Sequence, residues 1–281
     1  MRVGYLSRRG VEIYRERGFL NLLRAALRFI SYTIVDEPTR FALRSNVRHR
    51  FQQVRYDAPA DPFRTINVNP NEVQLANYEI TQYKGLGLIR NGEWDSTSNN
   101  VPIENYWSVK GIRERFIDGR DWEETDYYRH AAENLNENED FWRYEDIEEF
   151  KQVRCEYVDE LYAEIDENGY RPNSPDDHDV PEQTYKQMPH QKLEVLVTIA
   201  RDGEILFRDG HHRMAIAQIL NIDRIPVNIL ARHRDWQRIR DEVYTADSAS
   251  ELSSEAKANI SHPDLKDVVS DEIRRDVEPN L

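Results

Sequence analysis

The chain has 281 residues, 38 lysines and arginines, 52 aspartates and glutamates, and a formal net charge of −14. Its single cysteine, Cys155, excludes a disulfide framework and a multi-cysteine metal site. Fifteen tyrosines, nine phenylalanines and five tryptophans can fill a core, which excludes wholesale disorder. The chain has neither a signal-peptide pattern at its start nor an apolar run of about 18 residues, so we expect a cytoplasmic protein.

Only seven of the 38 basic residues are lysine. Abundant carboxylates with few lysines are typical of a cytoplasm rich in salt. At about 1 M salt the Debye length is only ~3 Å, so self-repulsion is screened and the carboxylates act mainly as hydrating groups. We therefore interpret the negative charge as halophilic adaptation and not as evidence for a basic partner.

Residues 1–55 differ from the rest, because they carry a net charge of +8 and leave −22 for the remaining 226 residues. Apolar residues recur at three- and four-residue steps within residues 11–35, which predicts a basic amphipathic helix. Such a helix could lie in a membrane interface, which would make the protein peripheral at the inner face of the membrane. It could equally pack on the protein's own core or on another protein.

Between residues 56 and 168 the pattern changes from strand-like to helical. Two prolines within residues 56–65 indicate a linker. The segment Asn69–Glu72 is typical of a turn into a short helix, because proline suits the first helical position and an acid suits the first turn. The elements expected here are a strand at Thr65–Val68 and helices at about Glu104–Phe116, from Thr125, and at Tyr144–Asn168, the last ended by Gly169.

A long loop and then a compact βαβ-like unit are expected next. Residues 170–190 hold four prolines among polar residues, which is typical of a lid or an insertion. Alanine, serine and acids dominate after residue 243, so we expect a flexible linker over Thr245–Glu255 before a charged terminal helix. The unit between them consists of strand Leu193–Ala200, turn Arg201–Gly203, strand Glu204–Arg208, helix His211–Asn221 and strand Ile225–Leu230.

Residues able to carry chemistry are concentrated where the second of these strands meets the helix, in Phe207-Arg208-Asp209-Gly210-His211-His212-Arg213. Gly210 lets the backbone approach a ligand, and the helix start offers N–H groups and the positive end of its dipole to an anion. Arg213 could contact phosphate oxygens, and His211 or His212 could donate to phosphate or move a proton. Asp209 could cap the helix, orient a histidine or bind a metal. The same pattern also fits a plain Asp-Gly turn.

Three other features have simpler explanations. Arg232-His233-Arg234 is a short basic patch that could touch nucleic acid, but the acidic balance favours a solvated helix start. Acids beside Trp94 and Trp122 are interpreted as surface charges next to packed tryptophans. Cys155 lies next to the apolar stripe of a predicted helix, so we interpret it as a structural thiol.

The segment Ile205–Ala217, followed by Ile225-Pro226-Val227, resembles the ParB/sulfiredoxin-like superfamily (the ParB-like nuclease domain family). The pattern of this superfamily is a strand, Asp-Gly-x-His-Arg, an alanine-rich helix and Ile-Pro-Val, and the same elements follow here in that order. Thr65–Pro70 is similar to the opening strand and turn. The whole chain also resembles haloarchaeal ParB-like proteins of unassigned activity.

The resemblance implies that Gly210, His212 and Arg213 contact nucleotide phosphates. Sulfiredoxins carry their catalytic cysteine immediately before the His-Arg pair, and His211 at that position argues against sulfiredoxin chemistry. Chromosome-partition proteins bind CTP and DNA and need a downstream helix-turn-helix, which the acidic C-terminal residues do not resemble. The free-serine kinases of the superfamily share a histidine-containing turn and use a carboxylate as base, for which Glu72 is the candidate by position.

The sequence thus predicts an α+β protein with a ParB/sulfiredoxin-like mixed sheet and helices. Composition and resemblance together divide the chain into three parts. These are a basic amphipathic helical segment at 1–55, a ParB/sulfiredoxin-like domain at 60–243 with a helical insertion at about 103–168, and an acidic linker and tail at 244–281.

The first functional hypothesis is a phosphotransferase or nucleotide hydrolase that uses ATP, ADP or CTP with Mg²⁺ and an unknown small-molecule acceptor. The second is a nucleotide-responsive or partner-binding module without turnover. The third is a ParB-like DNA-binding or nuclease protein, against which the acidic balance argues. No residue is predicted to be a metal ligand. The first hypothesis assigns nucleotide binding to Gly210, His211, His212 and Arg213, and catalysis to His212, Arg213, Asp209 and Glu72.

Overall fold

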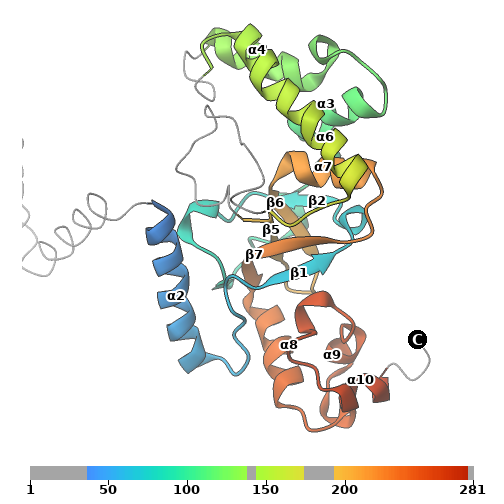
Figure 1. Cartoon of the computed structure of the whole chain (residues 1–281). Helices are drawn as coiled ribbons and strands as arrows, with labels where there is room; N and C mark the ends of the chain where they lie inside the picture. The colour runs from blue at the N-terminus through green and yellow to red at the C-terminus, as the bar shows by residue number, and fades with distance from the viewer. Residues whose placement is uncertain (1–36, 138–143, 174–192, 278–281) are drawn as a thin grey trace, which may run out of the picture.

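The computed structural model describes residues 37–137, 144–173 and 193–277 (Figure 1). The helix expected over residues 11–35 lies outside this part of the chain, as does most of the loop expected over residues 170–190. All six residues assigned to the candidate site lie within it.

Within the described residues, seven strands form one open mixed sheet, which confirms the α+β class with a mixed sheet. Their order is β1-β7-β5-β6-β2-β4, and β3 also pairs with β7. Strand β5 lies parallel to β7 and antiparallel to β6. The other neighbour of β6 is β2, which runs parallel to β6. The strands are β1 (Thr65–Val68), β2 (Leu75–Asn77), β3 (Leu88–Arg90), β4 (Asn100–Pro102), β5 (Val195–Ile199), β6 (Ile205–Asp209) and β7 (Ile225–His233).

Helices cover both sides of the sheet. All five residues of β5 are buried, as expected for a strand with both faces covered. In Figure 1, α3, α4, α6 and α7 lie on one side of the sheet, and α8, α9 and α10 lie on the other. Within the described residues, no helix has the length and apolar composition needed to cross a membrane. The helices are α2 (Glu37–Arg55), α3 (Trp107–Phe116), α4 (Asp126–Glu137), α5 (Ile147–Glu149), α6 (Glu156–Asn168), α7 (His211–Ile219), α8 (Arg234–Thr245), α9 (Ser254–Ala258) and α10 (Asp271–Val277).

The helix expected over Tyr144–Asn168 is present but contains a π-helical segment, Phe150–Cys155, between α5 and α6. The wider π turn buries Phe150, Arg154 and Cys155 together. Further along, Val158 in α6 is fully buried, and Gly169 with φ 74° ends the helix as expected.

The C-terminal residues differ from the expected linker and tail. Helix α8 continues to Thr245, and residues 249–277 add short helices that pack against the main core. The residues after α8 are mostly polar, but they contain a sparse apolar repeat with steps of four or five residues. Its buried members are Leu252, Ala256, Ile260, Leu265, Val269 and Ile273.

A buried ion-pair cluster fixes these residues to the sheet. Asp264 is fully buried, and its carboxylate accepts hydrogen bonds from Arg232 at 2.8 and 2.6 Å and from the Trp236 indole at 3.0 Å. Arg240 lies 3.5 Å from the same carboxylate. The basic patch Arg232-His233-Arg234 is therefore not a solvated helix start, because Arg232 and His233 are both buried.

His262 caps the turn that carries Asp264. Its Nδ1 accepts from the Asp264 N–H at 3.1 Å, and its Nε2 lies 3.0 Å from the carbonyl oxygen of Gly203. A neutral ring with its proton on Nε2 satisfies both contacts. Burial lowers the pKa of His262 from 6.5 to about 4.

The pKa of His262 predicts a loss of stability in acid. The unfolded chain binds more protons than the folded chain between pH 6.5 and about 4, so the free energy of unfolding falls as the pH is lowered through that window. His262→Asn keeps an acceptor for the Asp264 N–H but does not titrate, so the variant should lose less stability over the same window. Urea unfolding of both proteins at several pH values measures the difference. Parallel pH profiles would contradict the prediction.

Candidate functional site

The turn between β6 and α7 has an open helix start. Gly210 adopts φ 93°, and a Cβ there would lie 3.1 Å from both Cα and Cγ2 of Val195 in β5, so glycine is strongly favoured. The first intrahelical bond runs from the Met214 N–H to the Gly210 carbonyl at 3.0 Å. No side chain among the described residues caps α7. The start of α7 thus presents the N–H groups of residues 211–213, which have no intrahelical acceptor, in the arrangement that suits an anion.

His211 lies in an aromatic setting beside a carboxylate. Its ring stacks on Tyr106 at 4.2 Å between centroids and meets Phe207 edge-on at 4.9 Å. Its Nε2 lies 3.4 Å from the Tyr78 hydroxyl, and its Nδ1 lies 3.6 Å from Asp209 Oδ1. The side chain is 16% exposed, so a ligand at the turn can reach it. The imidazole is thus held between a carboxylate and a phenol, an arrangement suited to proton transfer.

Arg208 brings a positive charge to the same side of the turn. Its guanidinium lies 5.1 Å from the centroid of the Tyr78 ring. Its Nε donates to the Ile80 carbonyl at 2.7 Å, and Nη2 donates to the Gln82 side-chain oxygen, both neutral acceptors. Arg208 forms no ion pair within the described residues, so its charge is available to attract an anion.

His212 contacts the helices that pack against α7. Its Nε2 lies 2.8 Å from the Tyr127 hydroxyl, and its ring meets Tyr157 edge-on at 6.3 Å between centroids. Burial and then the nearby Arg154 lower the pKa of His212 well below 6.5. The ring is therefore neutral at pH 7 and occupied by an internal hydrogen bond.

Arg213 is also engaged internally. Its Nη1 lies 3.4 Å from Glu194 Oε2, and its Nη2 donates to the carbonyl of Arg171. Its guanidinium carbon lies 4.3 Å from the centroid of the Tyr170 ring. These contacts join α7 to the residues that follow α6 and precede β5.

Glu72 is distant from the turn. It ends the 3₁₀ turn Pro70–Glu72, whose neighbour in α7 is Gln218, because the Gln218 amide donates to the Pro70 carbonyl at 2.9 Å. Gln218 follows Gly210 by eight residues, about 12 Å along a helix at roughly 1.5 Å per residue. The structure therefore brings Asp209, Gly210 and His211 together but not Glu72.

Sequence reasoning missed Tyr78 and Tyr106 and gave Arg208 no role. Ala76 in β2 is paired in parallel register with Phe207 in β6, so two residues later Tyr78 stands level with Asp209. A predicted β2–β6 pairing would have found Tyr78. Tyr106 comes from the N-terminal end of α3, which no local pattern links to the turn.

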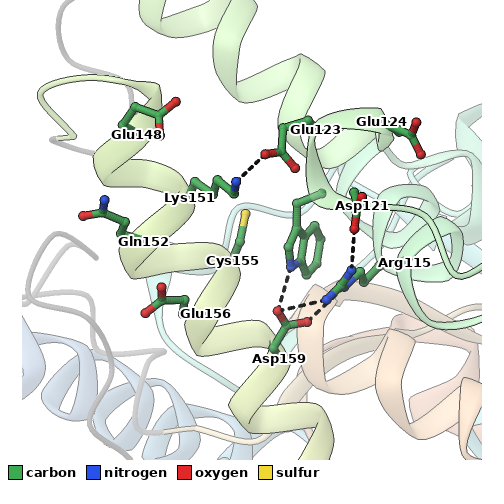
Figure 2. Close-up of a pocket in the computed structure, with 11 residues that line it drawn as sticks. Arg115, Asp121, Glu123, Glu124, Glu148, Lys151, Gln152, Cys155, Glu156 and Asp159 are labelled. Atoms are coloured by element: carbon green, nitrogen blue, oxygen red, sulfur yellow. Dashed lines mark hydrogen bonds and ion pairs between the residues drawn. The ribbon is translucent and has the colours of Figure 1, made fainter.

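A separate polar groove of about 780 Å³ lies between the helix that runs from α5 to α6 and residues 121–124, with Arg115 of α3 at its side (Figure 2). Trp122 donates to Asp159 at 2.9 Å, Arg115 pairs with the same carboxylate at 3.2 Å, and Lys151 pairs with Glu123. Burial raises the pKa of Cys155, so this thiol stays protonated, as a structural thiol should. Cys155 is therefore not an activated nucleophile in this groove. Among the described residues, no group of three or more potential ligands could hold a metal ion.

Comparison with known proteins identifies no family for this chain. No protein-family model, curated protein or solved structure matches the chain significantly.

Proposed function

We propose that the protein binds a phosphate-bearing ligand at the turn Asp209–Arg213, and that this ligand is a nucleoside di- or triphosphate such as ATP, ADP or CTP with Mg²⁺. The observation that carries the proposal is the uncapped start of α7 behind a left-handed Gly210, with Arg208 alongside. Backbone N–H groups and the helix dipole favour phosphate at this position. Asp209 supplies a carboxylate oxygen, the kind of ligand that Mg²⁺ takes in addition to phosphate oxygens.

A ParB/sulfiredoxin-like fold is part of the same proposal. Its support is the sequence motif together with the order of β6, the glycine turn, α7 and β7. The antiparallel pairing of β1 with β7 joins the predicted opening strand to the strand that carries Ile-Pro-Val.

The residue roles within this proposal differ from those expected from the sequence. His211 takes the acid–base role in place of His212, because His211 lies between Asp209 and Tyr78 and is partly exposed. His212 and Arg213 support the turn from behind through Tyr127 and Glu194. The distance of Glu72 from the turn favours Asp209 as the nearest carboxylate.

A nucleotide-responsive module without turnover is the second candidate. His212 and Arg213 are engaged in internal contacts, so of these three residues His211 alone is left as an acid–base group at the turn. This small number of catalytic groups favours a module without turnover. Turnover separates the two candidates. In a phosphotransferase or hydrolase, His211→Gln should retain nucleotide binding and lose turnover, whereas a binding module has no turnover to lose.

Thermal unfolding in about 2 M KCl with each nucleoside di- and triphosphate plus Mg²⁺ tests the proposal. A ligand at one hundred times its Kd should add about 2.7 kcal/mol to the free energy of unfolding. We expect Arg208→Gln to weaken nucleotide affinity at least about ten-fold, because it removes the charge beside the phosphate. The stabilisation by nucleotide should fall accordingly. Arg224→Gln changes an exposed arginine beyond the other end of α7 and should leave it unchanged. Absence of stabilisation by every nucleotide would overturn the proposal.

A further inference from the structure

The outer side of α2 carries an exposed apolar stripe, Leu43, Val47, Phe51 and Val54, called here the α2 stripe. These residues are 56%, 47%, 74% and 89% exposed. Their steps of four, four and three residues put them on one face of the helix. Figure 1 shows α2 standing at the edge of the molecule, beside the sheet.

The opposite face of α2 is fixed to the body of the protein. Phe41 is 2% exposed, and the Ser45 hydroxyl accepts from the Leu86 N–H at 2.9 Å. Arg48 donates to the Leu86 carbonyl at 2.9 Å, and Gln52 donates to the Gly87 carbonyl at 2.8 Å. These contacts settle which face of α2 points outward, so the α2 stripe is a fixed surface of the folded protein.

The charge around the α2 stripe is positive. Residues 37–55 contain five arginines and one acid, Glu37, whereas residues 56–281 carry −22. At roughly 100° per residue, Arg50 falls on one margin of the stripe, and Arg55 falls on the other. An apolar stripe that includes a phenylalanine and has arginines on both margins suits a helix that lies in an anionic membrane interface.

The same features disfavour pairing of two copies through this face. The stripe spans about 16 Å at roughly 1.5 Å per residue, and its four side chains are few beside the about 20–30 residues per side of a stable protein interface. Pairing two copies along the stripe would also bring arginines against arginines. We propose that the outer face of α2 binds an anionic lipid surface, with the α2 stripe inserted at the headgroup boundary and the flanking arginines on lipid phosphates.

Flotation of the full chain with phospholipid vesicles tests this assignment. We expect binding to vesicles that contain phosphatidylglycerol and weaker binding to phosphatidylcholine alone. Phe51→Ser combined with Val54→Ser should reduce binding at least about ten-fold, because two exposed side chains lose their insertion into lipid. The matched control is Val101→Ser with Ile117→Ser, which removes two other exposed apolar side chains, 43% and 54% exposed, and should change nothing.

Arg50→Gln combined with Arg55→Gln isolates the charge. At the lowest salt that keeps the protein folded, this variant should lose binding to anionic vesicles only. Equal losses in the stripe variant and its control would overturn the assignment, as would an absence of vesicle binding. A change of oligomeric state in the stripe variant without vesicle binding would also overturn it, in favour of a second copy.

Discussion

Replacing Asp264 with alanine is expected to lower the free energy of unfolding by about 3–5 kcal/mol, because the change strands buried arginines without their counter-charge. The carboxylate is fully buried and contacts Arg232, Arg240 and the Trp236 indole. Burial opposes its ionisation, but Arg232 and Arg240 outweigh burial and hold the pKa of Asp264 well below 3.8. Since whole domains are stable by about 5–15 kcal/mol, this loss is a large fraction of the total.

Asp267→Ala is the matched control. Asp267 pairs with Arg240 at 3.0 Å and also with Arg64, but its side chain is 35% exposed, so solvent screens both ion pairs. We expect a loss of about 1 kcal/mol for this variant. Urea unfolding at pH 7 measures both changes. Equal losses, or no loss for Asp264→Ala, would show that the C-terminal helices are not fixed to the sheet through this carboxylate.

Gly210→Ala should destabilise the turn and weaken ligand binding together. The left-handed backbone at φ 93° costs an alanine about 1–2 kcal/mol, and the new Cβ would press on Val195 at 3.1 Å. We expect a total loss of about 2–3 kcal/mol in the free energy of unfolding. Because the start of α7 must shift relative to β5 to relieve the contact, nucleotide-induced stabilisation should fall as well.

Gly92→Ala separates strain from contact. Gly92 has a similar φ of 103°, but a Cβ there meets no atom within 4 Å. This control should therefore cost only the backbone strain, about 1–2 kcal/mol, and leave nucleotide binding unchanged. If both variants cost the same, the close approach of β5 to the turn would have no energetic consequence.

Local signals in the sequence were sufficient for several elements. The Asn-Pro turn after β1 is capped as its residues require, because the Asn69 side chain accepts from the Asn71 N–H at 3.0 Å. The Asp-Gly turn and the start of α7 at His211 are where the motif predicted them. The strand at Val195–Ile199, apolar except for Thr198, is central and buried. In each case, neighbouring residues alone determine the conformation.

Tertiary contacts decided the rest. Consecutive helix residues point about 100° apart, so His211, His212 and Arg213 could not all face one ligand. Which of them faces the turn depends on Tyr106 and Tyr127, which arrive from distant helices. The residues near Asp264 resembled a solvated tail, because the two arginine partners of Asp264 lie more than twenty residues away in sequence. Neither the contacts of the tyrosines with the histidines nor those of the arginines with Asp264 can be predicted from a local sequence pattern.

The most direct test of the phosphate site is a backbone amide NMR titration of the full chain with the nucleotide that stabilises it. Inorganic pyrophosphate plus Mg²⁺ serves as a second probe that lacks the base. We expect saturable chemical-shift changes that are largest for the amides of His211, His212 and Arg213, and that weaken in Arg208→Gln. Saturable changes centred elsewhere, such as on the groove around Trp122, would contradict it, as would no change at the start of α7.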